Sequence, residues 1–273
     1  MRRRPLLQAL PAALAPIGVA ASAAAPLKTL RLALSSPETT LDPVQTNSDY
    51  NTSVVLSHIL EAPLRWDYLA RPVRQQPGTA VAMPEVSADG RVFTVRIRPG
   101  LFFADHPAFG GRPRELVAQD YVYAIKRFFD PRWNSSDLYL YESLKLPGLE
   151  AVRAQALKTR QPFDYDREVE GLRAPDRYTL RITLGVPDPR FIYMLGDPVY
   201  MGAVAREVVQ FHGDDIGAHP VGTGPFRLKS WRRGSRIVLE RSPGFRGLHY
   251  DGTPADTPEA REAAAHLAGK TLP

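Results

Sequence analysis

The sequence predicts a protein of the α/β class, in which short strands and helices follow one another along the chain. Residues 92–98 and 178–184 alternate between apolar and polar side chains, and a period of two is typical of a half-buried strand. Between them, residues 117–129 carry apolar side chains at helical spacing, which predicts an amphipathic helix packed on a core. The 26 prolines among 273 residues favour strands, turns and loops over long helices.

Composition narrows the class of protein. With 44% hydrophobic and 23% charged residues, the chain can build a core and resembles an ordinary globular protein. Three N-terminal arginines contribute to the net charge of +6. A net positive charge this small gives little support for nucleic-acid binding. The sequence has no cysteine, so we expect neither disulfides, nor thiolate metal sites, nor a cysteine nucleophile, nor a lipidated cysteine.

The N-terminus has the pattern of a secretory signal. A charged region at residues 2–4 precedes an apolar stretch at residues 6–19, and Ala21-Ser22-Ala23 fits the A-x-A cleavage pattern. We predict that residues 1–24 are a signal peptide, cleaved between about residues 21 and 25. A disordered or transit-like N-terminus is the alternative. No later apolar run reaches the ~20 residues of a membrane span, so we expect a periplasmic protein.

Residues 219–247 predict a β-hairpin after a glycine-proline turn. The turn is Val221-Gly222-Thr223-Gly224-Pro225, whose glycines permit positive φ and whose proline sets the exit direction. Strands are expected at residues 226–231 and 236–241, joined by the turn residues Arg233-Gly234-Ser235. Ser242-Pro243-Gly244 ends the second strand.

The order of these residues resembles the signature of the family 5 extracellular solute-binding proteins, the peptide- and nickel-binding receptors of ABC importers. The string P-x-G-T-G-P-[FY]-x-L, a tryptophan, a basic-glycine turn and I-V-L-E-R-x-P-x-[FY] correspond to residues 220–245. Further blocks match in the family's order at residues 41–43, 87–103 and 114–131. The chain departs from the pattern at Val117, where the family has a capping threonine.

The resemblance implies a fold and a domain organisation. The expected fold is a lobe like those of type II periplasmic binding proteins, with an inserted α+β domain. The first lobe would comprise residues 25–60 and 197–273, and the middle domain residues 61–196. Family members are longer than this chain, so we expect an incomplete first lobe, a missing C-terminal lobe and no normal tight binding.

The resemblance also implies where a ligand would be contacted. In the family, first-lobe contacts come from the polar loop after L-D-P, and a tyrosine beyond the helix-ending D-P faces the ligand. The candidate ligand-binding residues here are Asn47, Ser48, Asp49, Tyr50, and Tyr139 or Tyr141. Asp49 is the candidate to bind a ligand ammonium group. The alternative is that these polar residues simply form a solvent-exposed loop.

The resulting functional hypothesis is a substrate-binding component of an ABC importer. We expect a monomer that binds oligopeptides in an interlobe cleft and delivers them to an inner-membrane permease. A nickel chelate, an opine or an oligosaccharide is the alternative ligand. An exported hydrolase has no motif support, since G-x-S-x-G and H-E-x-x-H are absent from the sequence. A helix-ending loop explains residues 211–219 better than a metal site, so we expect no enzyme activity, cofactor or metal.

Overall fold

The computed structural model describes residues 28–46 and 48–272, and the chain divides into two units after Ala33. Leucines alternate with other side chains along residues 29–34, a pattern that predicts a short strand. That prediction is wrong, because the described residues 28–34 form neither helix nor strand. The side chains of Leu30 and Leu32 are 82% and 65% exposed, so the alternating pattern has no buried face to stabilise it. The predicted signal peptide lies outside the described residues.

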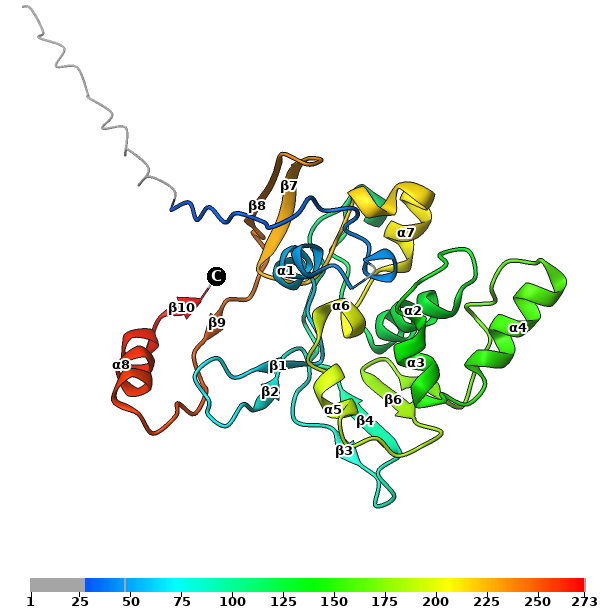
Figure 1. Cartoon of the computed structure of the whole chain (residues 1–273), viewed down its shortest axis with the longest axis horizontal. Coiled ribbons are helices and arrows are strands. Elements are labelled where there is room, and N and C mark those ends of the chain that lie inside the picture. Colours follow the sequence, from blue (N-terminus) through cyan, green and yellow to red (C-terminus); the bar gives the residue numbers. More distant parts are fainter. Residues whose placement is uncertain (1–27, 47, 273) are drawn as a thin grey trace, which may run out of the picture. The chain divides into compact units, whose positions relative to one another are not determined.

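The second unit, from Leu34 onwards, consists of runs of short strands and runs of helices that follow one another along the chain (Figure 1). Its helices are α1 (Tyr50–Ile59), α2 (Ala118–Phe129), α3 (Leu138–Leu144), α4 (Leu149–Thr159), α5 (Phe191–Met194), α6 (Pro198–Met201), α7 (Arg206–His212) and α8 (Pro258–Leu267). Short 3-10 helices are η1 (Pro43–Gln45), η2 (Pro107–Phe109) and η3 (Gly213–Ala218). Its strands are β1 (Leu64–Trp66), β2 (Gln75–Pro77), β3 (Glu85–Val86), β4 (Val92–Arg96), β5 (Leu172–Asp176), β6 (Thr179–Thr183), β7 (Phe226–Arg232), β8 (Arg236–Arg241), β9 (Leu248–His249) and β10 (Thr271–Leu272).

An antiparallel four-stranded sheet, in the order β3-β4-β6-β5, forms the base of the main core. In its register Phe93 lies opposite Ile182 and Val95 opposite Leu180, and all four side chains are buried. The two strands predicted from alternation are therefore confirmed, because apolar residues at every second position line one face of the sheet. Strand β5, which contains a proline, was not predicted.

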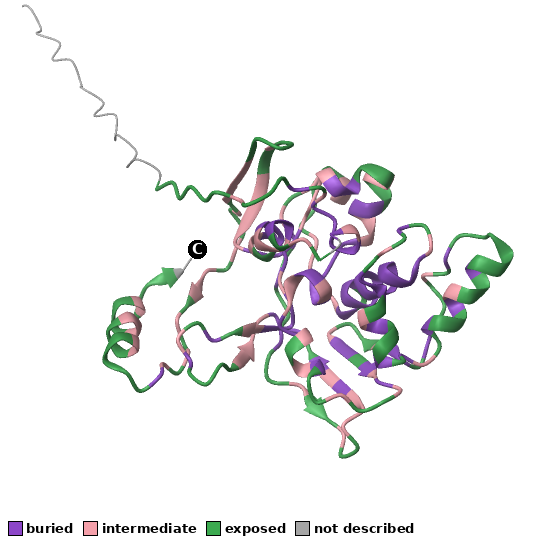
Figure 2. Cartoon of the chain, in the orientation of Figure 1, coloured by how far each residue is buried: buried purple, intermediate pink, exposed green. Residues whose placement is uncertain are grey.

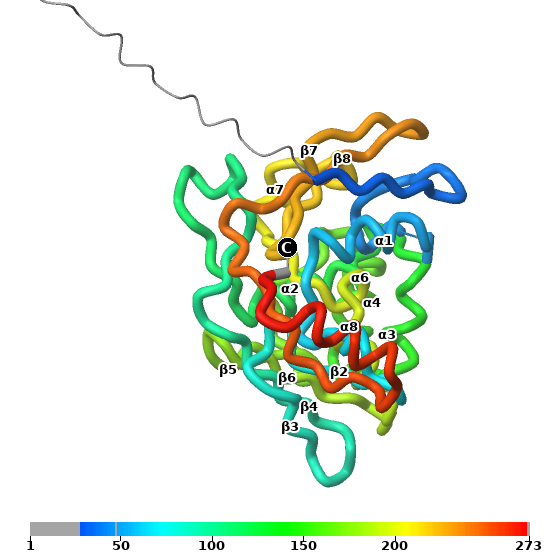
Figure 3. Tube along the Cα trace, turned by 90° about the vertical axis from the view of Figure 1, so that its left-hand side faces the viewer, coloured from blue at the N-terminus to red at the C-terminus, as the bar shows by residue number. Residues whose placement is uncertain are grey.

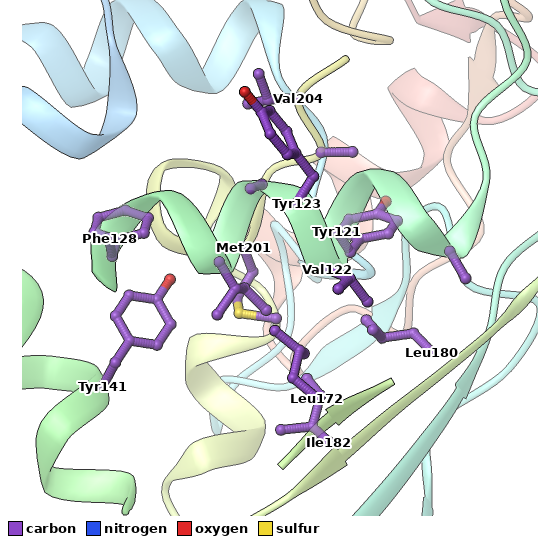
Figure 4. Packing of buried hydrophobic residues seen from close by; sticks show 14 of the residues in the cluster. Tyr121, Val122, Tyr123, Phe128, Tyr141, Leu172, Leu180, Ile182, Met201 and Val204 are labelled. Carbon is purple, nitrogen blue, oxygen red and sulfur yellow. The ribbon is translucent and has the colours of Figure 1, made fainter. Parts of the chain in front are cut away.

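Helix α2 packs across this sheet, and its apolar stripe is the centre of the core. Figure 4 shows Val122 on the side of α2 that faces Leu180, and Tyr141 of α3 beside Phe128. The missing cap at Val117 is also confirmed, since no side-chain capping bond from this residue is found among the described residues. The Asp120 carboxylate accepts the Val117 N–H at 2.8 Å instead, which satisfies one backbone donor at the helix start.

The predicted hairpin is confirmed as β7 paired with β8. Together with α1 it encloses a second, smaller hydrophobic cluster, and α1 and β7 lie side by side in both views (Figures 1 and 3). The cluster consists of Leu41, Val55, Leu56, Ile59, Leu60 and Val199, covered by the partly buried Tyr200, Leu228, Trp231, Ile237 and Leu239. In Figure 2 the hairpin is mostly of intermediate burial, whereas α2 is almost wholly buried.

The glycines before the hairpin serve a different purpose from the one expected. Neither Gly222 nor Gly224 has a positive φ. A Cβ at Gly222 would lie 2.1 Å from the Ile59 carbonyl oxygen, and one at Gly224 would lie 2.6 Å from the same atom. The Gly224 N–H donates to that oxygen at 2.9 Å. These glycines therefore allow the turn to approach the end of α1 closely.

The expected division at residues 60 and 196 stays a prediction. The smaller cluster draws on residues 41–60 and 199–239, as a discontinuous lobe would. The main cluster also includes Met201 and Ile216 from beyond residue 196. The sequence also predicts short helices at residues 187–195 and 203–211, the second ended by Gly213. Both helices are shorter than predicted: α5 spans Phe191–Met194, and α7 spans Arg206–His212 with Gly213 as its cap.

Candidate functional site

The loop between η1 and α1 carries the first group of candidate residues. Ser48 is exposed and has a φ of 56°, a left-handed conformation that costs a non-glycine residue about 1 kcal/mol. Asp49 is the N-cap of α1, and its carboxylate accepts from the backbone N–H of Asn51 at 3.1 Å and of Thr52 at 3.3 Å. Tyr50 opens the helix and is 76% exposed. Asn47 lies outside the described residues.

A buried carboxylate from another part of the chain holds this loop. Asp137, only 1% exposed, precedes α3. Its carboxylate accepts from the Ser48 hydroxyl at 2.6 Å, from the Ser48 N–H at 3.2 Å and from the Thr46 hydroxyl at 3.2 Å. The loop is thus held by a side chain at the start of α3.

The two candidate tyrosines of α3 have opposite surroundings. Tyr139 is 58% exposed, and Tyr141 is 1% exposed. The Tyr141 hydroxyl donates to the Tyr200 carbonyl oxygen, and burial raises the pKa of this phenol well above its usual value. Tyr139 is therefore available to a ligand, whereas a contact from Tyr141 requires its ring to leave the core.

An ion pair fixes the chain immediately before the loop. Arg127 of α2 and Asp42 form two hydrogen bonds of 2.8 and 2.7 Å, and both side chains are at most 1% exposed. Burial opposes the charge on Arg127, but the Asp42 carboxylate outweighs it and raises the pKa of the guanidinium. A bidentate ion pair of this kind fixes the orientation of both side chains.

Sequence reasoning identified the loop but missed what holds it. Asp42 and Arg127 both stand in blocks that match the family pattern, yet nothing in either block indicates that they pair across 85 positions. Asp137 lies in a stretch that does not match that pattern. Its only sequence signal is its place before a helix, which predicts capping rather than a contact with residue 48.

Histidines form a second polar cluster that the sequence did not indicate. The Nε2 atoms of His106 and His212 are 2.9 Å apart, and the rings of His212 and His219 stack with centroids 3.7 Å apart. The His106 Nδ1 accepts the Ala108 N–H at 3.1 Å, so its neutral ring carries the proton on Nε2 and donates to His212. In the part of the chain that the structure describes, no three His, Cys, Asp or Glu residues form a group able to hold a metal ion.

Comparison with protein families gives a match over most of the chain. The profile described as bacterial extracellular solute-binding proteins, family 5 middle, matches residues 74–260. The Di/tripeptide-binding protein 2 of Pseudomonas aeruginosa is 26% identical over 190 residues, which cover 66% of this chain and 32% of that protein. The periplasmic oligopeptide-binding protein OppA of Escherichia coli is 29% identical over 171 residues, covering 62% and 28%. The chain thus spans about a third of the length of such relatives.

A comparison of folds agrees with the sequence match. The substrate-binding domain of an oligopeptide ABC transporter from Bacillus anthracis aligns with a TM-score of 0.63 and 23% identity, over 77% of this chain and 37% of that one. This supports the expected fold, a lobe like those of periplasmic binding proteins, at the level of architecture. Within residues 28–46 and 48–272, no helix is both long and apolar enough to cross a membrane.

Proposed function

Because the chain belongs to the bacterial extracellular solute-binding proteins of family 5, we propose that it carries part of the binding site of a peptide receptor. The receptor would deliver peptides to the permease of an ABC importer in the inner membrane. The observation that carries the proposal is the family match over residues 74–260, and two relatives of the chain are named for binding di-, tri- and oligopeptides.

The candidate loop offers groups suited to a peptide. Ser48, Tyr50 and Tyr139 are exposed. The phenols of Tyr50 and Tyr139 can donate and accept hydrogen bonds, whereas the Ser48 hydroxyl donates to Asp137 and is left as an acceptor. An extended peptide presents alternating N–H and C=O groups, which such a surface can bind without reading the peptide sequence. We keep Asn47, Asp49 and Tyr141 as proposed contacts, with Asp49 sharing its carboxylate between the cap of α1 and a ligand ammonium group.

The remaining parts of the proposal follow from the family. We propose export by a cleavable signal at residues 1–24, a periplasmic location and a monomeric receptor. The relatives described above are named as binding proteins, which favours binding over catalysis. Ligand-dependent stabilisation without turnover is therefore the expected behaviour.

Thermal unfolding with defined ligands tests the proposal. Trialanine and pentaalanine serve as probes, and Ni²⁺ with citrate, octopine and maltotriose represent the other ligand classes. At 100 times its Kd, a ligand stabilises the folded protein by about 2.7 kcal/mol, which raises the Tm of a chain this size by roughly 5–10 °C. Isothermal calorimetry then gives the Kd of each probe.

The outcomes separate the classes. A rise in Tm with either peptide and with none of the other probes supports the peptide receptor. A rise with a non-peptide probe alone, or cleavage of the peptides during the measurement, contradicts it.

A further inference from the structure

We propose that Asp137 is a positioning residue for ligand binding, which holds Thr46 and Ser48 in a fixed position relative to the segment that carries Tyr139 on α3. This inference rests on the proposed function. The buried carboxylate of Asp137 would align two chain segments that lie about 90 positions apart in the sequence and would contact the same peptide.

The position of Asp137 would ordinarily give it a different task. It occupies the N-cap of α3, yet among the described residues its side chain makes no capping bond to that helix. An aspartate at this position usually stabilises its own helix by accepting backbone N–H groups. Here the carboxylate is directed to the loop, where it accepts three hydrogen bonds from Thr46 and Ser48.

The loop adopts a conformation that needs this support. Ser48 has a φ of 56°, in the left-handed region that is unfavourable for a residue with a side chain. Asp137 accepts two hydrogen bonds from Ser48 alone, and hydrogen bonds to a carboxylate are stronger than those between neutral groups. The carboxylate thus stabilises a backbone conformation that serine would not otherwise favour.

Burial makes this arrangement specific. Asp137 is 1% exposed and Thr46 is 0% exposed. A carboxylate removed from water must be hydrogen-bonded, so α3 and the loop cannot slide past each other without losing these bonds. These buried hydrogen bonds therefore also fix the positions of the exposed residues Ser48 and Tyr50.

A second contact anchors the segment that carries Tyr139. The Tyr141 hydroxyl of α3 donates to the Tyr200 carbonyl oxygen of α6. Tyr139 therefore lies between two residues of its own segment, Asp137 and Tyr141, that both have partners elsewhere in the fold. These contacts fix the backbone from which the exposed Tyr139 side chain projects.

Peptide affinity in matched variants tests the proposal. Asp137→Ala removes all three bonds, and we expect the Kd for the peptide probe with the highest affinity to rise by at least 10-fold. Asp137→Asn has the same shape and keeps one acceptor oxygen, so we expect a smaller rise. Asp130→Asn is the control, because Asp130 is also a buried carboxylate at a helix end, 6% exposed, but accepts from Tyr165 and Arg132 instead of the loop.

Hydrogen exchange supplies a readout that does not require ligand. The Ser48 amide donates to Asp137, so its exchange should be faster in Asp137→Ala and unchanged in Asp130→Asn. Faster exchange together with weaker binding supports the proposal. If Asp137→Ala does not fold, the same comparison is made with Asp137→Asn.

Two negative results are distinguishable. Wild-type affinity in both Asp137 variants would refute the positioning role while leaving the proposed function intact. Failure of the wild-type chain to bind either peptide would refute the proposed function and, with it, a role for Asp137 in binding.

Discussion

Removal of Arg127 should destabilise the protein more than the loss of an ordinary surface charge. In Arg127→Met, an unbranched apolar side chain fills part of the space, and the Asp42 carboxylate stays buried without its partner. Asp42 is 0% exposed in its side chain, so water cannot replace the two lost hydrogen bonds.

The magnitude follows from the burial of both groups. Removal of one partner from a buried ion pair costs about 3–5 kcal/mol, a large share of the roughly 5–15 kcal/mol that stabilises a typical domain. At about 2–4 °C for each kcal/mol, Tm should fall by roughly 6–20 °C. The double variant Arg127→Met with Asp42→Leu removes both charges and should recover most of the loss, since an apolar pair of similar volume is often neutral or stabilising.

Urea unfolding followed by circular dichroism measures these differences as shifts in the free energy of unfolding. Arg132→Met is the control, because its side chain is 55% exposed and its ion pair with Asp214 lies at the surface, where such pairs contribute about 0–1 kcal/mol. A loss below 1 kcal/mol in Arg127→Met would refute the reasoning. A double variant whose loss equals the sum of the two single losses would refute it as well.

Two further predictions concern the histidine cluster and the glycine turn. Burial, with repulsion from His219, lowers the pKa of His106 and of His212, and Asp215 opposes this only at His212. The unfolded state then binds more protons between the lowered pKa and 6.5, so their contribution to stability is complete above about pH 6.5 and is lost as the pH falls. Urea unfolding at several pH values should show this loss, and a wild-type pH profile in His106→Gln would contradict it. Gly224→Ala places a Cβ 2.6 Å from the Ile59 carbonyl oxygen and should lower the free energy of unfolding by about 1–3 kcal/mol. Gly244→Ala is the control and should lower it little, because a Cβ there has nothing within 4 Å. Equal losses of stability in urea unfolding would refute the close-approach explanation.

The sequence by itself determined those helices and strands that can be identified from the spacing of apolar residues within the element. Alternation along residues 92–98 and 178–184 identified β4 and β6, and the helical stripe identified α2, because burial of one face imposes a period on the side chains. The hairpin was predicted for the same reason. The order of these blocks also indicated the family, and the resemblance pointed to the polar loop at residues 44–50 as a candidate site.

Tertiary structure decided which local patterns were realised. Residues 29–34 alternate as cleanly as a strand, yet Leu30 and Leu32 are exposed, because alternation does not supply a neighbouring strand or a core. The glycines at 222 and 224 are required by the position of α1 and not by their own φ angles. Neither the exposure of the two leucines nor the close approach of the two glycines to α1 is determined by residues nearby in the sequence.

The candidate site shows the same division. Its polar loop was visible in the sequence, but the partners that hold it were not, since Asp137 and Ser48 are separated by 89 positions. Tyr139 and Tyr141 were equivalent candidates until packing buried one and exposed the other. Hydrogen bonds and burial between distant segments depend on the folded path of the whole chain, and only the tertiary structure determines that path.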